Sequence, residues 1–100
     1  MANPYDPTAG LFGISVAAGM VGTGVQNLRA YEKAGLVDPR RTPGGTRLYS
    51  LDDITRLRQI SALLDEGLNL AGIAMVLRLE ADNARLQREI SAQRDRRRGR

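Results

Sequence analysis

One hundred residues without cysteine or histidine allow one small domain and exclude disulfides, thiol sensing and metal sites built on those residues. No apolar run is long enough to span a membrane, and the first residues lack the basic-then-apolar layout of a signal peptide, so we expect a cytoplasmic protein. The net charge of +4 comes from residues 94–100, where five arginines outweigh one aspartate, whereas residues 26–47 carry five cations against two anions. A local excess of cations of this kind is typical of nucleic-acid binding.

The first part of the chain predicts a leader and two short helices. Residues 1–12 contain two prolines and little periodicity, so we expect them to be flexible. A helix is expected to open at Ile14, with Ser15 as its N-cap, and the glycines of residues 22–24 end it. A second helix is expected over residues 25–34. Because the connection is so short, the pair is predicted to form a helix-turn-helix.

A basic hairpin is predicted directly after the second helix. Residues 40–49 alternate weakly around a Pro43-Gly44-Gly45 tip, where we expect both glycines to be structural and to supply the positive φ of a tight turn. Arginines stand on both arms of this ribbon. A cationic helix followed by an arginine-bearing ribbon is the layout of a winged-helix DNA reader, with the helix in a major groove and the ribbon on the neighbouring backbone.

The second half of the chain predicts two further helices. Ser50 and the acids Asp52 and Asp53 form a strong helix start, and an apolar stripe runs from Leu51 to Leu64. Asn69 is predicted to cap a last helix. The domain is therefore expected to divide into a flexible leader over 1–12, a winged helix-turn-helix over 13–77, a dimerisation helix over 78–93 and a basic disordered tail over 94–100.

The predicted dimerisation helix carries a weak heptad seam. Its members step by four, three and four residues, and they are Leu79, Asn83, Leu86 and Ile90. Two heptads alone do not hold a helix pair in water, so the seam is expected to act within a larger interface. Asn83 either sets the register of a buried seam or is exposed. The tail either attracts DNA through its charge or is merely solvated.

Nine side chains are the candidate DNA contacts. Arginine pairs with guanine or phosphate, amides at a helix start pair with adenine, and tyrosine hydroxyls reach phosphate. The alternatives are ordinary: helix capping for the amides, core packing for the tyrosines and solvated edge charges for the wing arginines. The candidates are Gln26, Asn27, Arg29, Tyr31, Lys33, Arg40, Arg41, Arg47 and Tyr49.

Several motifs together resemble the MerR family of bacterial transcription regulators. Residues 28–36 read Leu-Arg-Ala-Tyr-Glu-Lys-Ala-Gly-Leu, residues 47–49 read Arg-Leu-Tyr, and an acid-rich helix start follows at residues 52–54. The resemblance covers about residues 14–90. It implies a mainly α winged helix-turn-helix with a small β-hairpin wing and a C-terminal dimerisation helix, and a nucleoid-associated regulator of transcription.

Within that family the chain looks similar to the HspR-type heat-shock repressors. Residues 66–73 read Glu-Gly-Leu-Asn-Leu-Ala-Gly-Ile, residues 14–18 read Ile-Ser-Val-Ala-Ala, and the wing segment 39–45 is also alike. The resemblance implies a homodimer on an inverted-repeat operator of double-stranded DNA, repression of stress or chaperone genes, and feedback from a DnaK-type chaperone. Because no sensory domain is seen after the predicted dimerisation helix and the sequence has neither histidine nor cysteine, we expect any signal to be a protein partner, temperature or concentration.

Other classes of protein remain as alternatives. The carboxylates have no histidine or cysteine beside them to tune a pKa, so we expect neither an enzyme nor a catalytic residue, and no metal site or cofactor. An excisionase-like architectural protein shares the winged fold, but the length of chain past Leu77 disfavours it. A protein-interaction module with a basic wing would bind an acidic partner and show no affinity for DNA.

Overall fold

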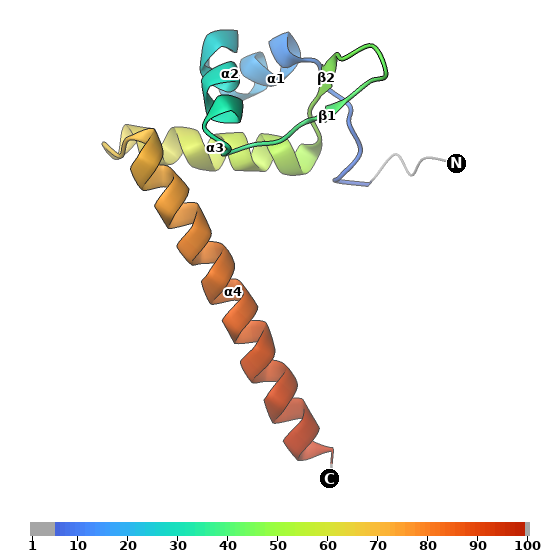
Figure 1. The fold of residues 1–100 in the computed structure, drawn as a ribbon, viewed down its shortest axis with the longest axis vertical. Coiled ribbons are helices and arrows are strands. Elements are labelled where there is room, and N and C mark those ends of the chain that lie inside the picture. Colours follow the sequence, from blue (N-terminus) through green and yellow to red (C-terminus); the bar gives the residue numbers. More distant parts are fainter. Residues whose placement is uncertain (1–5, 100) are drawn as a thin grey trace.

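The structure, a computed structural model, describes residues 6–99 and is mainly helical. Figure 1 shows two short helices on one side of a third, a small ribbon beside them, and a long fourth helix that projects from the body. The predicted fold, a helix-turn-helix with a hairpin wing, is confirmed. In chain order the elements are α1 (Ile14–Val21), α2 (Val25–Lys33), β1 (Arg40–Arg41), β2 (Arg47–Leu48), α3 (Leu51–Asp65) and α4 (Leu70–Arg98).

Glycines set the sharp turn between α1 and α2. Gly22 ends α1 in the left-handed region, with φ of 78°, where a side chain would be strained. Gly24 is the N-cap of α2. The prediction that Ser15 caps α1 is wrong: the N-cap is Gly13, whose carbonyl accepts from the Ala17 amide, so Ser15 already lies inside the first turn.

The start of α3 follows the prediction closely. The Ser50 hydroxyl accepts from the Asp53 amide at 3.0 Å, and the Asp53 carboxylate accepts from the Ser50 amide at 2.9 Å. This capping box satisfies two helix-end donors and places acids at the positive end of the helix dipole. Leu51, the first member of the predicted stripe, is nevertheless exposed, because it lies at the helix start beyond the packed face.

The core lies between α1, α2, α3 and the first two turns of α4. Its members are apolar except for two tyrosines, and each short helix gives only two residues to it, so the body depends on α3 as its central support. None of the helices in the described part of the chain has the length and apolar character of a membrane span. The buried residues of the core are Ala17, Ala18, Leu28, Tyr31, Leu36, Val37, Tyr49, Ile54, Leu57, Ile60, Ile73 and Leu77.

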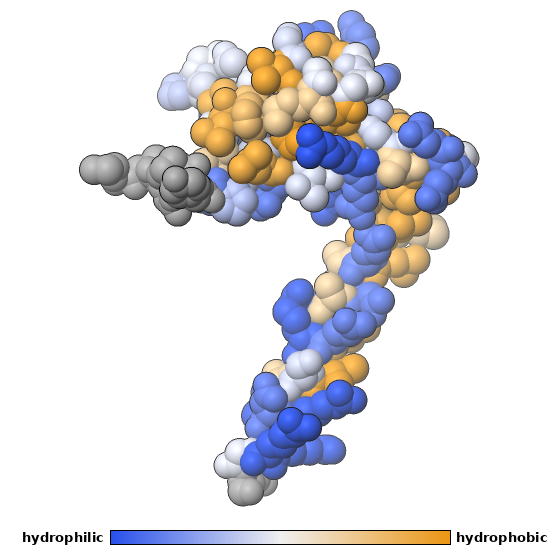
Figure 2. All heavy atoms as spheres, turned by 180° about the vertical axis from the view of Figure 1, so that it is seen from behind, coloured by the Kyte–Doolittle hydropathy of each residue, from blue (hydrophilic) through white to orange (hydrophobic). Residues whose placement is uncertain are grey.

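Helix α4 leaves the body after its first two turns. Asn69 caps it by accepting from the Gly72 amide at 2.8 Å, as predicted, and Ile73 and Leu77 anchor it in the core. Beyond Leu77 nearly all of its residues are exposed, and Figure 2 shows mostly hydrophilic side chains with apolar patches along this part. The helix continues to Arg98, where the sequence predicts a disordered tail from residue 94; Arg100 lies outside the described residues.

Residues 6–12 are held against the wing, which differs from the predicted flexible leader. Phe12 and Tyr49 form an antiparallel bridge, in which the Tyr49 amide donates to the Phe12 carbonyl at 2.7 Å and the Phe12 amide donates back at 3.0 Å. The Asp52 amide also donates to the Pro7 carbonyl at 3.0 Å. This segment therefore supports the base of the wing; residues 1–5 of the predicted leader lie outside the described residues.

Candidate nucleic-acid interface

Helix α2 has one buried and one polar face. Leu28 and Tyr31 point into the core and fix the rotation of the helix. The opposite face exposes Gln26, Arg29 and Lys33, which recur at helical spacing. The structure therefore places three of the predicted contacts on one solvent-facing surface. An exposed helical face of this kind fits the width of a major groove.

The cations of this face form no ion pairs among the described residues, although Arg40 lies near the Asp6 carboxylate, whose pKa is lowered mainly by hydrogen bonds from Thr8 and to a smaller extent by the charge of Arg40. Neither Arg29 nor Lys33 forms an ion pair within residues 6–99, and the same holds for Arg40 on the first wing strand. All three side chains are exposed. They are consequently available to an anionic ligand such as a DNA phosphate or a guanine edge.

Asn27 is held partly by its own helix start. Its Nδ2 donates to the Thr23 hydroxyl at 2.7 Å, across the turn between α1 and α2. The side chain is exposed, and its Oδ1 takes no hydrogen bond from the residues described. Asn27 thus braces the turn but does not cap the helix, whose N-cap is Gly24 without a side-chain cap, and its contact with DNA stays a prediction.

The wing is a very short antiparallel ribbon. Arg40 pairs with Leu48, and Arg41 pairs with Arg47. At the tip the Gly45 amide donates to the Thr42 carbonyl at 2.8 Å. Only Gly45 has a positive φ, of 87°, whereas Gly44 does not, and a methyl group at Gly44 would meet only the Thr42 hydroxyl, at 3.8 Å. The prediction that both tip glycines supply positive φ is therefore wrong for Gly44.

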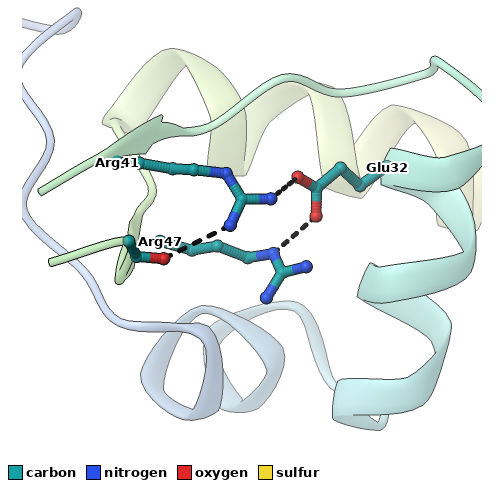
Figure 3. Close-up of polar contacts among 4 residues, drawn as sticks. Glu32, Arg41 and Arg47 are labelled. Carbon is teal, nitrogen blue, oxygen red and sulfur yellow. Dashed lines mark hydrogen bonds and ion pairs between the residues drawn. The ribbon is translucent and has the colours of Figure 1, made fainter.

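Glu32 joins the wing to α2, a role that sequence reasoning missed. Its Oε1 lies 2.6 Å from Nη2 of Arg41, and its Oε2 lies 2.5 Å from Nε of Arg47 (Figure 3). Burial opposes ionisation of this carboxyl, but the hydrogen bond and charge of Arg47 and the charge of Arg41 outweigh burial and lower its pKa. The only sequence signal was that Glu32 is the sole acid of α2.

The two tyrosines lie in the core beneath the interface. Tyr49 is 0% exposed, so it offers no surface to DNA and is a correction to the predicted contacts, whereas Tyr31 is 4% exposed and a contact through its hydroxyl stays a prediction. The Tyr49 hydroxyl is buried without a hydrogen-bond partner among the described residues. Burial raises the pKa of this hydroxyl, and the nearby Glu32 carboxylate raises it further. Tyr49 therefore packs beneath the wing, which is the alternative that the sequence left open.

Replacing Tyr49 by phenylalanine is expected to leave DNA affinity unchanged and to raise the free energy of unfolding by about 1 kcal/mol, because it removes a buried polar group without a partner. Urea denaturation measures the gain. In the parent protein the pKa of Tyr49 is higher in the folded chain than in the unfolded chain. The free energy of unfolding should therefore fall as the pH rises above about 10, since tyrosine ionises first in the unfolded chain. Weaker DNA binding at unchanged stability would return Tyr49 to the contact surface.

The assembled surface is electropositive. Among the five cations of α2 and the wing, Arg41 and Arg47 form ion pairs, both with Glu32, whereas Arg29, Lys33 and Arg40 form none within residues 6–99. Within the described range, no three acidic side chains come together as a metal site. The surface can bind a polyanion and offer a helix to a groove.

The chain is similar in sequence to a known family of regulatory proteins and to individual members of it. The model of the MerR HTH family regulatory proteins matches residues 12–80. A protein assigned as the heat shock protein HspR of Streptomyces coelicolor is 49% identical over 88 residues, covering 85% of this chain and 58% of the relative. The transcriptional regulator GlnR of Bacillus anthracis is 43% identical over 70 residues, covering 70% and 54%. The chain thus spans little more than half the length of either relative.

A solved structure has a similar arrangement. HiNmlR, a MerR family regulator lacking the sensor domain and bound to promoter DNA, superposes with a TM-score of 0.58 at 28% identity. The superposition covers 62% of this chain and 50% of HiNmlR.

Proposed function

The chain belongs to the MerR family of helix-turn-helix regulators and is a DNA-binding regulator of transcription, not an enzyme; from this premise we propose that it is a homodimeric repressor of stress-response genes. Its operator would be an inverted repeat, because two copies related by a twofold axis present two copies of α2 to the DNA. Occupancy of such a site would by itself exclude the polymerase.

The arrangement of α2 and the wing supports a division of the DNA contacts. Gln26, Asn27 and Arg29 lie in the first half of the helix, where side chains reach base edges in helix-turn-helix complexes. Lys33 lies at the end of the helix and Arg40 on the wing, positions that suit phosphate contacts. We propose that Arg29 is the main base contact, because a guanidinium can pair with guanine through two hydrogen bonds.

The exposed part of α4 supports a dimer. Leu79, Leu86 and Ile90 are 60%, 48% and 49% exposed, although they are large and apolar. They recur on one side of the helix, and nothing in residues 6–99 covers them. A second copy of the same helix would bury this seam, with Asn83, also exposed, beside it.

The stress-gene assignment rests on the likeness to HspR, which exceeds the likeness to GlnR in identity and in coverage of this chain. We extend it to a DnaK-type chaperone as a further partner that would strengthen or relieve repression. This chain covers 58% of the length of HspR. The regulated genes and the signal are therefore proposed from the likeness to HspR, whereas the proposed DNA contacts of α2 and the wing do not depend on it.

Selection of genomic fragments with the purified protein, followed by footprinting of the tightest fragment, tests the proposal. An inverted repeat upstream of a chaperone operon is the expected result. An inverted repeat in front of other genes would keep the dimer and reject the heat-shock role. Head-to-tail sites would favour an excisionase-like architectural protein, and no selective recovery would favour a protein-interaction module.

A further inference from the structure

The Glu32 carboxylate links three elements of the DNA-binding surface. Its two oxygens are used separately, one by an arginine of β1 and the other by an arginine of β2. Figure 3 shows the side chain reaching from α2 toward both strands. Its own side chain is only 16% exposed, so the pairing is shielded from solvent more than an ordinary surface ion pair. One residue of α2 therefore restrains the whole ribbon.

The wing needs such a restraint, because its register is electrostatically unfavourable. Arg41 and Arg47 are direct cross-strand partners, and like charges in that position repel each other. The ribbon has only two residue pairs in its ladder, and an isolated hairpin of that size is marginally stable in water. A carboxylate between the two guanidinium groups turns the repulsion into two charge-assisted hydrogen bonds.

The pairing uses the two arginines differently. Arg41 has both terminal nitrogens engaged: Nη2 donates to Glu32, and Nη1 donates to the Gly45 carbonyl at 3.3 Å. Arg47 donates to Glu32 through Nε, and its two terminal nitrogens make no hydrogen bond within the described range. Both terminal nitrogens of Arg47 therefore remain free for a bidentate acceptor, whereas each terminal nitrogen of Arg41 already donates one hydrogen bond within the protein.

We propose that Glu32 is the positioning residue that holds the wing against α2 before DNA binds, with Arg41 bracing the ribbon and Arg47 contacting a phosphate; this rests on the proposed DNA-binding function. A preorganised wing avoids the ordering cost of a mobile loop at the moment of binding. Glu32 thereby raises affinity for the specific site, where α2 and the wing must engage together, more than it raises non-specific affinity.

The matched variants Glu32→Gln and Asp38→Asn separate positioning from charge. Each removes one negative charge from the basic segment, but Asp38 is exposed and forms no ion pair with the residues described. We measure binding to the selected site and to an unrelated duplex at several salt concentrations. Glu32→Gln should lower the ratio of specific to non-specific affinity by about threefold to tenfold, and Asp38→Asn should leave that ratio unchanged. Equal behaviour of the two variants would overturn the proposal.

A double-mutant cycle tests the coupling through the carboxylate. Arg41→Gln should weaken specific binding in the parent and have little further effect in the Glu32→Gln background, because the pairing is already lost. Arg47→Gln should weaken binding in both backgrounds and lower the salt slope by about 0.9, as expected for one phosphate contact. Additive effects of Glu32→Gln and Arg41→Gln would contradict the proposal.

A measurement without DNA keeps this inference separate from the proposed function. Backbone amide order parameters of residues 40–48, measured by NMR, should fall in Glu32→Gln while the amides of α3 stay rigid. Unchanged order in the wing would overturn the positioning role even if the parent protein binds DNA tightly. If the parent selects no duplex, the proposed function fails, and the order parameters still decide whether Glu32 holds the wing.

Discussion

Replacing Arg29 by alanine is expected to weaken binding to the tightest DNA site by about 5- to 150-fold, which corresponds to about 1–3 kcal/mol, and to relax base preference at one position. The side chain is exposed on α2, and no carboxylate among residues 6–99 pairs with it, so its removal costs the folded chain little. The loss would come from a guanidinium that donates two hydrogen bonds to a guanine edge. Fluorescence anisotropy against a panel of single-base operator variants measures both effects.

Two controls distinguish a base contact from a charge. Arg29→Lys keeps the charge but loses the planar fork, so it should lose most of the base preference while keeping part of the affinity. Lys33→Ala removes a cation one turn further along the same face and should weaken all sequences alike, with a salt slope lower by about 0.9. If Arg29→Ala binds its best site as tightly as the parent, the assignment of α2 to the groove is wrong.

Local signals in the sequence predicted the elements well. Ser50 and Asp53 are only three positions apart, so the sequence alone indicated a capped helix start there. Asn69 was predictable as the N-cap of α4 from the same kind of local pattern. The predicted end of the second helix near residue 34 is also local: Ala34 is its C-cap, and Gly35 follows with a positive φ of 76°. These features depend on residues a few positions apart, which is the range over which a sequence pattern determines backbone conformation.

Tertiary pairing explains what the sequence did not predict. Glu32 lies nine and fifteen positions from its two arginines, and only the register of the wing brings both within reach of one carboxylate. Tyr49 follows a cationic residue, Arg47, and an apolar one, Leu48. The local sequence was therefore compatible both with a hydrogen bond to a DNA phosphate and with packing in the core. The bridge of Tyr49 to Phe12, in a segment that the sequence predicts to be flexible, buries it.

Replacing Leu86 by aspartate is expected to convert a dimer into a monomer and to lower affinity for an inverted repeat by about 100-fold or more, because the two copies no longer bind as one unit. Leu86 is exposed in the single chain, so the change does not disturb the folded body. In a dimer the same position would be buried, where an unpaired carboxylate costs several kcal/mol. Light scattering coupled to size-exclusion chromatography reports the mass, and the operator titration reports the affinity.

Ala84→Asp is the matched control, because it introduces the same charge two residues away. Two residues along a helix turn the side chain by about 200°, so Ala84 points roughly 160° away from Leu86 and lies off the seam. Both positions are exposed on the free helix, so their effects on α4 alone should be similar.

A dimer that survives Leu86→Asp would mean that the interface lies elsewhere than on this seam. A monomeric Leu86→Asp that still bound the inverted repeat like the parent would instead mean that the two halves of the operator are read independently. The selectivity for inverted repeats would then have to come from the DNA and not from α4.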